Sequence, residues 1–125
     1  KDDLGYMGRL TYAQNISAVT GACMMISKKV WDEVGGLDKD FAVAFNDIDL
    51  CMRIRKKGYL IVFTPFAELY HYESKSRGMD TQGSNSERFA GEVALFHSRW
   101  DEILKKGDPY YNPNLDPISN SFALR

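Results

Sequence analysis

A charged segment with helical spacing that runs directly into an apolar strand places the tightest constraint on how this chain folds. Residues 46–57 end in two lysines and are followed by Gly58, and cations before a glycine are typical of a helix C-terminus. The next residues, 59–64 (YLIVFT), are β-branched and aromatic and end at Pro65, which predicts a strand. A helix and a strand therefore follow each other closely here.

Glycines, prolines and apolar patterning predict the other elements. The expected order is a buried strand at 16–26, a short helix at 28–34 between Ser27 and Gly35, a helix from Asn46 or Asp47 with Ile48, Cys51 and Met52 on one face, a strand at 59–64, an extended piece at 67–72 and a long helix at 86–106. Three of the four prolines lie beyond Gly107, so the tail should be irregular, held to the body by its aromatic residues. The class is α/β or α+β, with an incomplete sheet.

The composition of the 125 residues excludes several classes of protein. Sixteen Lys and Arg against 17 Asp and Glu leave no basic excess for binding nucleic acid. The longest uncharged stretch, residues 10–27, contains polar side chains, so no membrane span is expected. No signal peptide is visible, and the lack of an initiator Met indicates an excised segment. Cys23 and Cys51 are too few for a disulfide framework and predict buried, reduced thiols in a cytosolic protein.

Asp47 is the side chain best placed for acid–base chemistry. Asn46 is expected to be the N-cap and Asp47 to lie in the first turn, where the helix dipole and free N–H groups stabilise a negative charge. A fixed carboxylate beside a cavity can accept a proton from a substrate hydroxyl. Asn and Asp are also favoured at helix starts without any chemical role, and spacing alone does not separate these interpretations.

Two D-x-D sequences, at 38–40 and 47–49, have the spacing of a metal motif. Within a helix, side chains two residues apart point about 200° away from each other, so Asp47 and Asp49 are poorly placed to coordinate one ion. The sequence at 38–40 is more typical of a solvated turn. Neither motif by itself predicts a metal site.

His71 and the basic residues after it leave two interpretations open. His71 lies at the end of the predicted extended piece 67–72 and is either a ligand for a divalent ion or an ordinary hydrogen-bonded residue. Lys75, Ser76 and Arg77 either hold phosphate oxygens or are simply solvated. His97, next to the apolar stripe of the long helix, is interpreted as structural.

An ordered set of motifs carries a resemblance to a known family. TGACMMI, VGGLD, FNDIDLCMRIRKKGY and a His followed by SKSRG occur in this order within residues 18–78, and DPYYNPNL follows in the tail. The set resembles the C-terminal half of the catalytic domain of family-two glycosyltransferases of the GT-A fold, and is similar to bacterial enzymes of the rhamnosyltransferase and surface-polysaccharide type. The resemblance implies a partial GT-A, Rossmann-like α/β fold: a small mixed sheet flanked by helices, with an extended tail.

The resemblance also implies roles for individual residues. Asp47 matches the family's catalytic base, with Asn46 in a substrate-binding position where many members have Glu or Asp. His71 matches a frequent metal or diphosphate ligand. The remaining matches are substrate-binding: Thr20, Gly21 and Ala22 line the acceptor and sugar pocket, and Ser76 and Arg77 belong to a loop that closes over the donor diphosphate.

The implied function is that of the acceptor-side half of an inverting glycosyltransferase, covering residues 1–125. It acts with a nucleotide diphosphate sugar, a glycan acceptor and a divalent ion (Mg²⁺ or Mn²⁺), in the cytoplasm or at the inner face of the membrane. The family's nucleotide-binding half has no counterpart here, so the chain alone should be inactive and should self-associate through uncovered apolar residues. A stand-alone carbohydrate-binding module and, more remotely, a metal hydrolase using Asp47 and His71 are the alternatives.

Overall fold

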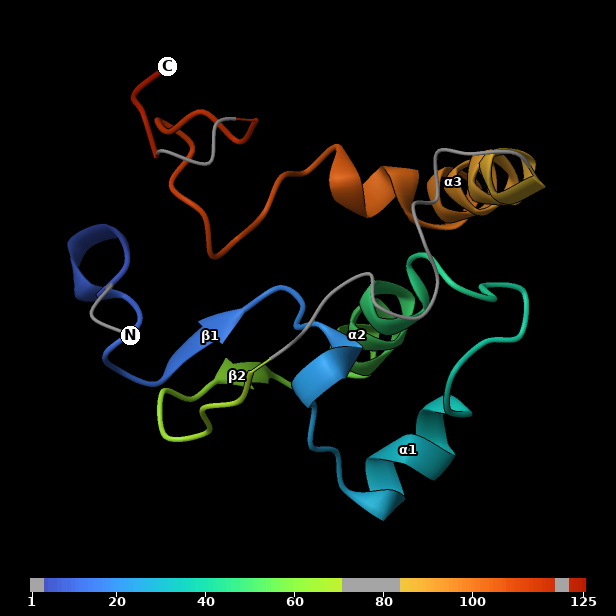
Figure 1. The fold of residues 1–125 in the computed structure, drawn as a ribbon, viewed down its shortest axis with the longest axis horizontal. Helices are drawn as coiled ribbons and strands as arrows, with labels where there is room; N and C mark the ends of the chain where they lie inside the picture. Colours follow the sequence, from blue (N-terminus) through green and yellow to red (C-terminus); the bar gives the residue numbers. More distant parts are fainter. Residues whose placement is uncertain (1–3, 71–83, 119–121) are drawn as a thin grey trace.

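The computed structural model describes residues 4–70, 84–118 and 122–125. Its elements in chain order are the 3-10 helix η1 (Tyr6–Gly8), strand β1 (Gln14–Ile16), the 3-10 helix η2 (Gly21–Cys23), helices α1 (Lys28–Val34) and α2 (Asn46–Lys56), strand β2 (Ile61–Phe63) and helix α3 (Ser84–Leu104) (Figure 1). This order confirms the expected α/β class. The two strands pair antiparallel, with Gln14 opposite Phe63, so the described part of the sheet contains no parallel pair that would make it mixed.

Helix α2 is the centre of the molecule because it is buried on two sides. Toward α3, Met52 joins a cluster with Phe41, Phe96 and Trp100. Toward the sheet and α1, its apolar residues form a second cluster, which contains Leu50, Cys51, Ile54 and Ile61. Figure 1 shows α2 between the sheet and α3. Burial on two sides fixes the position of both ends of this helix.

Local capping determines the bounds of α1, which agree with the expected helix at 28–34. The Ser27 hydroxyl accepts a hydrogen bond from the Val30 N–H at 3.3 Å, as an N-cap does. Gly35 adopts the left-handed conformation, with φ 82°, which ends the helix. Gly36 also has positive φ, and a Cβ there would lie 2.8 Å from the Trp31 ring, so only glycine fits.

The expected strand at 16–26 is wrong apart from Ile16. After β1 the chain leaves the sheet and turns through η2, where the Thr20 hydroxyl accepts from the Ala22 N–H at 3.3 Å. Residues 24–26 are extended and alternate in burial, with Met25 99% exposed between Met24 and Ile26, but they pair with no described strand. Cys23 is exposed as well, contrary to expectation, whereas Cys51 is buried as expected.

The helical face and strand bounds also differ in part from expectation. Ile48 is exposed, while Cys51 and Met52 are buried. Strand β2 is shorter than 59–64, and residues 67–70, the described part of the second extended piece, form no strand. Helix α3 begins at Ser84 and ends at Leu104, so it is shifted by two residues from the expected 86–106.

The tail is irregular, as expected, and its aromatic residues contact both Arg55 of α2 and the N-terminal segment. Leu115 is buried and forms an isolated antiparallel bridge with Leu124. The Phe122 ring stacks on Tyr6, with centroids 4.7 Å apart, and on Tyr111 at 5.8 Å. Aromatic stacking thus joins the two ends of the described chain.

Candidate active site

Asp47 lies in the first turn of α2, and its carboxylate is held by two backbone N–H groups. Oδ2 accepts from the Gly21 N–H and Oδ1 from the Ile48 N–H, each at 2.8 Å. The first bond comes from η2, so the structure brings Thr20, Gly21 and Ala22 next to the carboxylate. The family resemblance implied that residues 20–22 and Asp47 belong to one site, and the structure places them side by side.

Gly21 leaves space beside the carboxylate. A Cβ at residue 21 would lie 3.4 Å from Cβ of Asp47 and 3.7 Å from Oδ2. Gly21 is exposed and Asp47 is partly exposed. Because Gly21 has no side chain, one side of the carboxylate remains open to other molecules. An oxygen with an open side and further lone pairs can still accept a proton from another molecule.

The start of α2 differs from the expected capping. Asn46 is the first helical residue, and Phe45 is the N-cap, in the left-handed conformation with φ 62° and no side-chain cap. The Phe45 carbonyl accepts the first helical bond, from the Asp49 N–H, at 2.7 Å. The turn is therefore made by a backbone conformation that is sterically costly for a residue other than glycine, and something must stabilise it.

Glu92 of α3, which the sequence reasoning missed, supplies part of that support. It is 4% exposed, and its two carboxylate oxygens accept from the Val43 N–H at 3.1 Å and the Ala44 N–H at 2.8 Å. The sequence does contain an indication of this role. Glu92 lies three residues after Phe89 and four before Phe96, within the apolar stripe of the expected helix, and a buried acidic side chain needs a hydrogen-bond partner.

Asp49 is a buried ion-pair centre and not a metal ligand. It is fully buried and accepts from Arg53 Nε at 2.8 Å, Arg99 at 3.0 Å and the Trp100 indole N–H at 2.9 Å. Because Arg99 and Trp100 belong to α3, Asp49 joins α2 to α3. Two arginines and one indole N–H thus occupy both oxygens of Asp49.

The turn at 38–40 is joined to the same network. The backbone N–H of Asp40, and after it the Arg99 guanidinium 2.7 Å from Oδ2, lower the pKa of Asp38. The hydrogen bond that Arg99 donates to Asp38 in turn raises the pKa of Arg99. One arginine thus bridges this turn and the buried Asp49.

The described residues do not offer a metal site. Within residues 4–70, 84–118 and 122–125, no three His, Cys, Asp or Glu side chains are grouped so that they could hold an ion. His97 lies 2.8 Å from Asp101 on the exposed side of α3. His71, Ser76 and Arg77, expected to bind metal and diphosphate, lie outside the described residues, as does Lys75.

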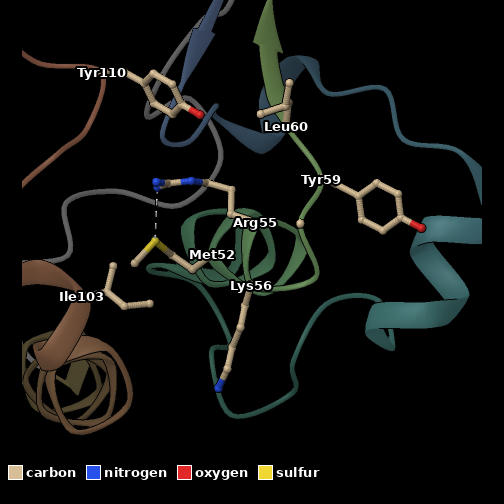
Figure 2. A pocket seen from close by; sticks show the side chains of 8 residues that line it. Met52, Arg55, Lys56, Tyr59, Leu60, Ile103 and Tyr110 are labelled. Carbon is tan, nitrogen blue, oxygen red and sulfur yellow. Dashed lines mark hydrogen bonds between the residues drawn. The ribbon is translucent and has the colours of Figure 1, made fainter.

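A cavity of about 300 Å³ lies at the other end of α2. Figure 2 shows Arg55 between Met52 and the Tyr110 ring, with Ile103 below them. The Arg55 guanidinium lies 5.5 Å from the Tyr110 centroid. The cavity-lining residues of α2 run from Met52 to Lys56, five to nine residues after Asp47, or about 7–14 Å along the helix axis. Asp47 and the residues of η2 do not line this cavity, so the candidate site is the open surface at Asp47 and η2.

Comparison with known proteins gives related sequences for nearly the whole chain. It is 48% identical over 121 residues to "Uncharacterized protein y4gI" of Sinorhizobium fredii, which covers 96% of this chain and 13% of that protein. It is 32% identical over 119 residues to "O-antigen biosynthesis protein RfbC" of Myxococcus xanthus, covering 94% and 9%. A third relative, "N-acetylglucosaminyl-diphospho-decaprenol L-rhamnosyltransferase" of Mycobacterium tuberculosis, is 34% identical over 62 residues, covering 50% and 20%. The chain therefore spans a small part of each relative.

No solved structure matches the chain significantly. None of the described helices is long and apolar enough to cross a membrane. The family model described as "Glycosyltransferase like family 2" matches residues 5–91. This range includes η2, α1, α2 and the Gly21–Asp47 contact, and on this match the chain belongs to glycosyltransferase family 2.

Proposed function

We propose that this chain is the acceptor-side part of an inverting glycosyltransferase, which moves a sugar from a nucleotide diphosphate sugar to a glycan hydroxyl in polysaccharide biosynthesis. The observation that carries the proposal is the hydrogen bond from the Gly21 N–H to the Asp47 carboxylate. It holds a proton acceptor at an open surface, inside the range that the family matches. The relatives named for O-antigen biosynthesis and L-rhamnosyl transfer support the substrate class.

In the proposed reaction Asp47 is the general base. The acceptor hydroxyl gives its proton to the carboxylate while its oxygen bonds to the anomeric carbon of the donor sugar. The bond from that carbon to the diphosphate breaks, and the diphosphate leaves with the electron pair. The bonds from Gly21 and Ile48 hold the carboxylate in one orientation before reaction, which removes the need to order it in the transition state.

The donor side of the proposal depends on residues other than those of the described site. Neither D-x-D sequence, at 38–40 or 47–49, follows a described strand, so neither has the strand-end position that the family uses for its nucleotide. We assign nucleotide binding to residues outside this chain, and contacts with the diphosphate to His71, Ser76 and Arg77. A divalent ion, if held partly by His71, would neutralise diphosphate charge.

The test replaces the proton acceptor in the protein that carries this chain. Asp47→Asn keeps the size of the side chain and one oxygen, so folding should persist, while turnover with nucleotide-linked hexoses, L-rhamnose included, should fall about 100- to 10,000-fold. Asp40→Asn is the matched control, because Asp40 is exposed and near α2. It should leave turnover unchanged.

Two results would count against the proposal. Near-normal turnover in Asp47→Asn would show that Asp47 is not the general base and only stabilises the start of the helix. Glycan binding that needs no nucleotide sugar, without any transfer, would instead indicate a carbohydrate-binding module.

A further inference from the structure

Helix α3 contacts the segment before α2 through three side chains on one face. Phe89, Glu92 and Phe96 are spaced by three and four residues, so they lie on the same side of the helix. The carboxylate of Glu92 accepts from the N–H groups of Val43 and Ala44, at 3.1 and 2.8 Å. Two successive backbone N–H groups that converge on one carboxylate form an anion-binding arrangement, here filled by a buried side chain of the protein itself.

The same face holds the residue that follows these N–H groups. Phe45 has φ 62° and ψ 0°, a conformation that residues with a Cβ rarely adopt. Its ring stacks on Phe96, with centroids 4.9 Å apart, and on Phe89 at 5.9 Å. Both the backbone before the turn and the side chain at the turn are therefore fixed by α3.

This turn determines the direction in which α2 starts, and with it the position of Asp47 two residues later. We propose that Glu92 is a positioning residue for Asp47: by binding the Val43 and Ala44 N–H groups it maintains the left-handed turn at Phe45 that places the carboxylate against Gly21. Glu92 does not face the open surface itself. The catalytic consequence rests on the proposed function, whereas the geometric consequence does not.

A purely local role for Glu92 would have a different signature. Glu92 also lies 3.9 Å from Arg88 Nε on its own helix, a longer contact than those with the loop. If Glu92 only stabilised α3 or the loop, its loss would leave the distant bond between Gly21 and Asp47 unchanged. The Gly21 amide is therefore the decisive reporter, because its N–H donates to Asp47 of α2 and lies in η2, outside both α3 and the segment that Glu92 binds.

The experiment is amide NMR on the full chain, uniformly labelled with ¹⁵N. Glu92→Gln keeps one acceptor oxygen but turns an NH₂ donor toward an N–H donor, so exchange at Val43 and Ala44 should become about tenfold faster. The Gly21 amide proton should move toward its position in Asp47→Ala. Glu102→Gln, an identical change at an exposed residue of α3, should change neither signal.

An unchanged Gly21 resonance together with faster exchange at Val43 and Ala44 would overturn the positioning role. If Glu92→Gln does not fold, Glu92→Asp provides the same measurement, because its shorter carboxylate can reach one N–H but not both. In a transfer assay Glu92→Gln should lower kcat about tenfold and leave the donor KM unchanged. Absence of transfer in the unaltered full-length protein that carries this chain would contradict the proposed function only, since the Gly21 resonance still decides the role of Glu92.

Discussion

The backbone N–H of Gly21 donates a 2.8 Å hydrogen bond to Oδ2 of Asp47, although 26 residues separate the two in sequence. The bond ties the short η2 turn to the first turn of α2. A Cβ added at Gly21 would lie 3.4 Å from Cβ of Asp47, an ordinary van der Waals contact, so the bond can form beside a methyl group, which would occupy space next to the carboxylate. Space beside the carboxylate and its orientation are thus coupled through one residue.

Adding a methyl group at this position should affect acceptor binding more than folding. Gly21 does not have a positive φ, so the backbone at residue 21 can accommodate alanine without strain. The free energy of unfolding of Gly21→Ala should therefore change by less than about 1 kcal/mol. The methyl group occupies space beside Asp47, and the acceptor KM should rise roughly tenfold, with an unchanged donor KM. Steady-state kinetics with each substrate varied in turn measures both values.

Gly91→Ala is the control for that substitution. Gly91 lies in α3 with nothing within 4 Å of an added Cβ, so alanine should stabilise the helix by about 0.5–1 kcal/mol and leave both KM values unchanged. An equal loss of acceptor affinity in both variants would show that the Gly21 effect is not local.

Loss of the charge on Asp49 should destabilise the protein. Asp49→Asn removes the negative charge that three donors share in the interior. We expect a loss of about 3 kcal/mol, at the low end for a broken buried pair because both arginines are partly exposed. Tm should fall by roughly 10–15 °C. Asp101→Asn, which breaks exposed pairs of α3, should cost less than about 1 kcal/mol, and similar Tm losses in both variants would contradict this account.

Stability in acid should depend on Asp38. Its pKa lies below the ordinary value of 3.8 because of the Asp40 N–H and Arg99. A lowered folded-state pKa means that the stabilisation is present above the pKa of the unfolded chain and is lost as the pH falls through the folded-state pKa. Denaturant unfolding between pH 5 and about pH 2 should therefore show a weaker pH dependence in Asp38→Asn. Asp40→Asn keeps the backbone N–H and should retain the dependence of the unaltered chain.

The two thiols should react at very different rates. Cys23 is exposed, whereas Cys51 is 1% exposed and burial raises the pKa of its thiol. A thiol reagent at neutral pH should label Cys51 at least about 100-fold more slowly than Cys23, because only transient opening exposes it and little thiolate forms. Cys23→Ser should remove the fast phase alone. Two fast phases in the folded chain would contradict the burial of Cys51 in the apolar cluster that α2 forms with Ile61 of β2.

Much of the fold could be predicted because short-range signals determine it. The bounds of α1 follow from Ser27 and Gly35, and the end of α2 from the cations before Gly58. The strand at 16–26 could not be predicted correctly, since an apolar, β-branched composition does not reveal that the Thr20 hydroxyl turns the chain into a 3-10 helix. Helical periodicity placed Ile48 on the buried face with Cys51 and Met52, but Ile48 is exposed and the neighbouring Asp49 is buried, because Asp49 binds donors of α3.

The sequence by itself determined the class of fold, the family motifs and the helix start that carries Asp47. Only the tertiary structure decided what surrounds that helix start: Gly21 beside Asp47, Glu92 on the Ala44 N–H, 48 residues away, and Trp100 on Asp49, 51 residues away. The physical reason is range. Caps, glycines and prolines act on the backbone within a few residues, whereas a buried carboxylate takes whichever donors the packing of distant helices brings to it.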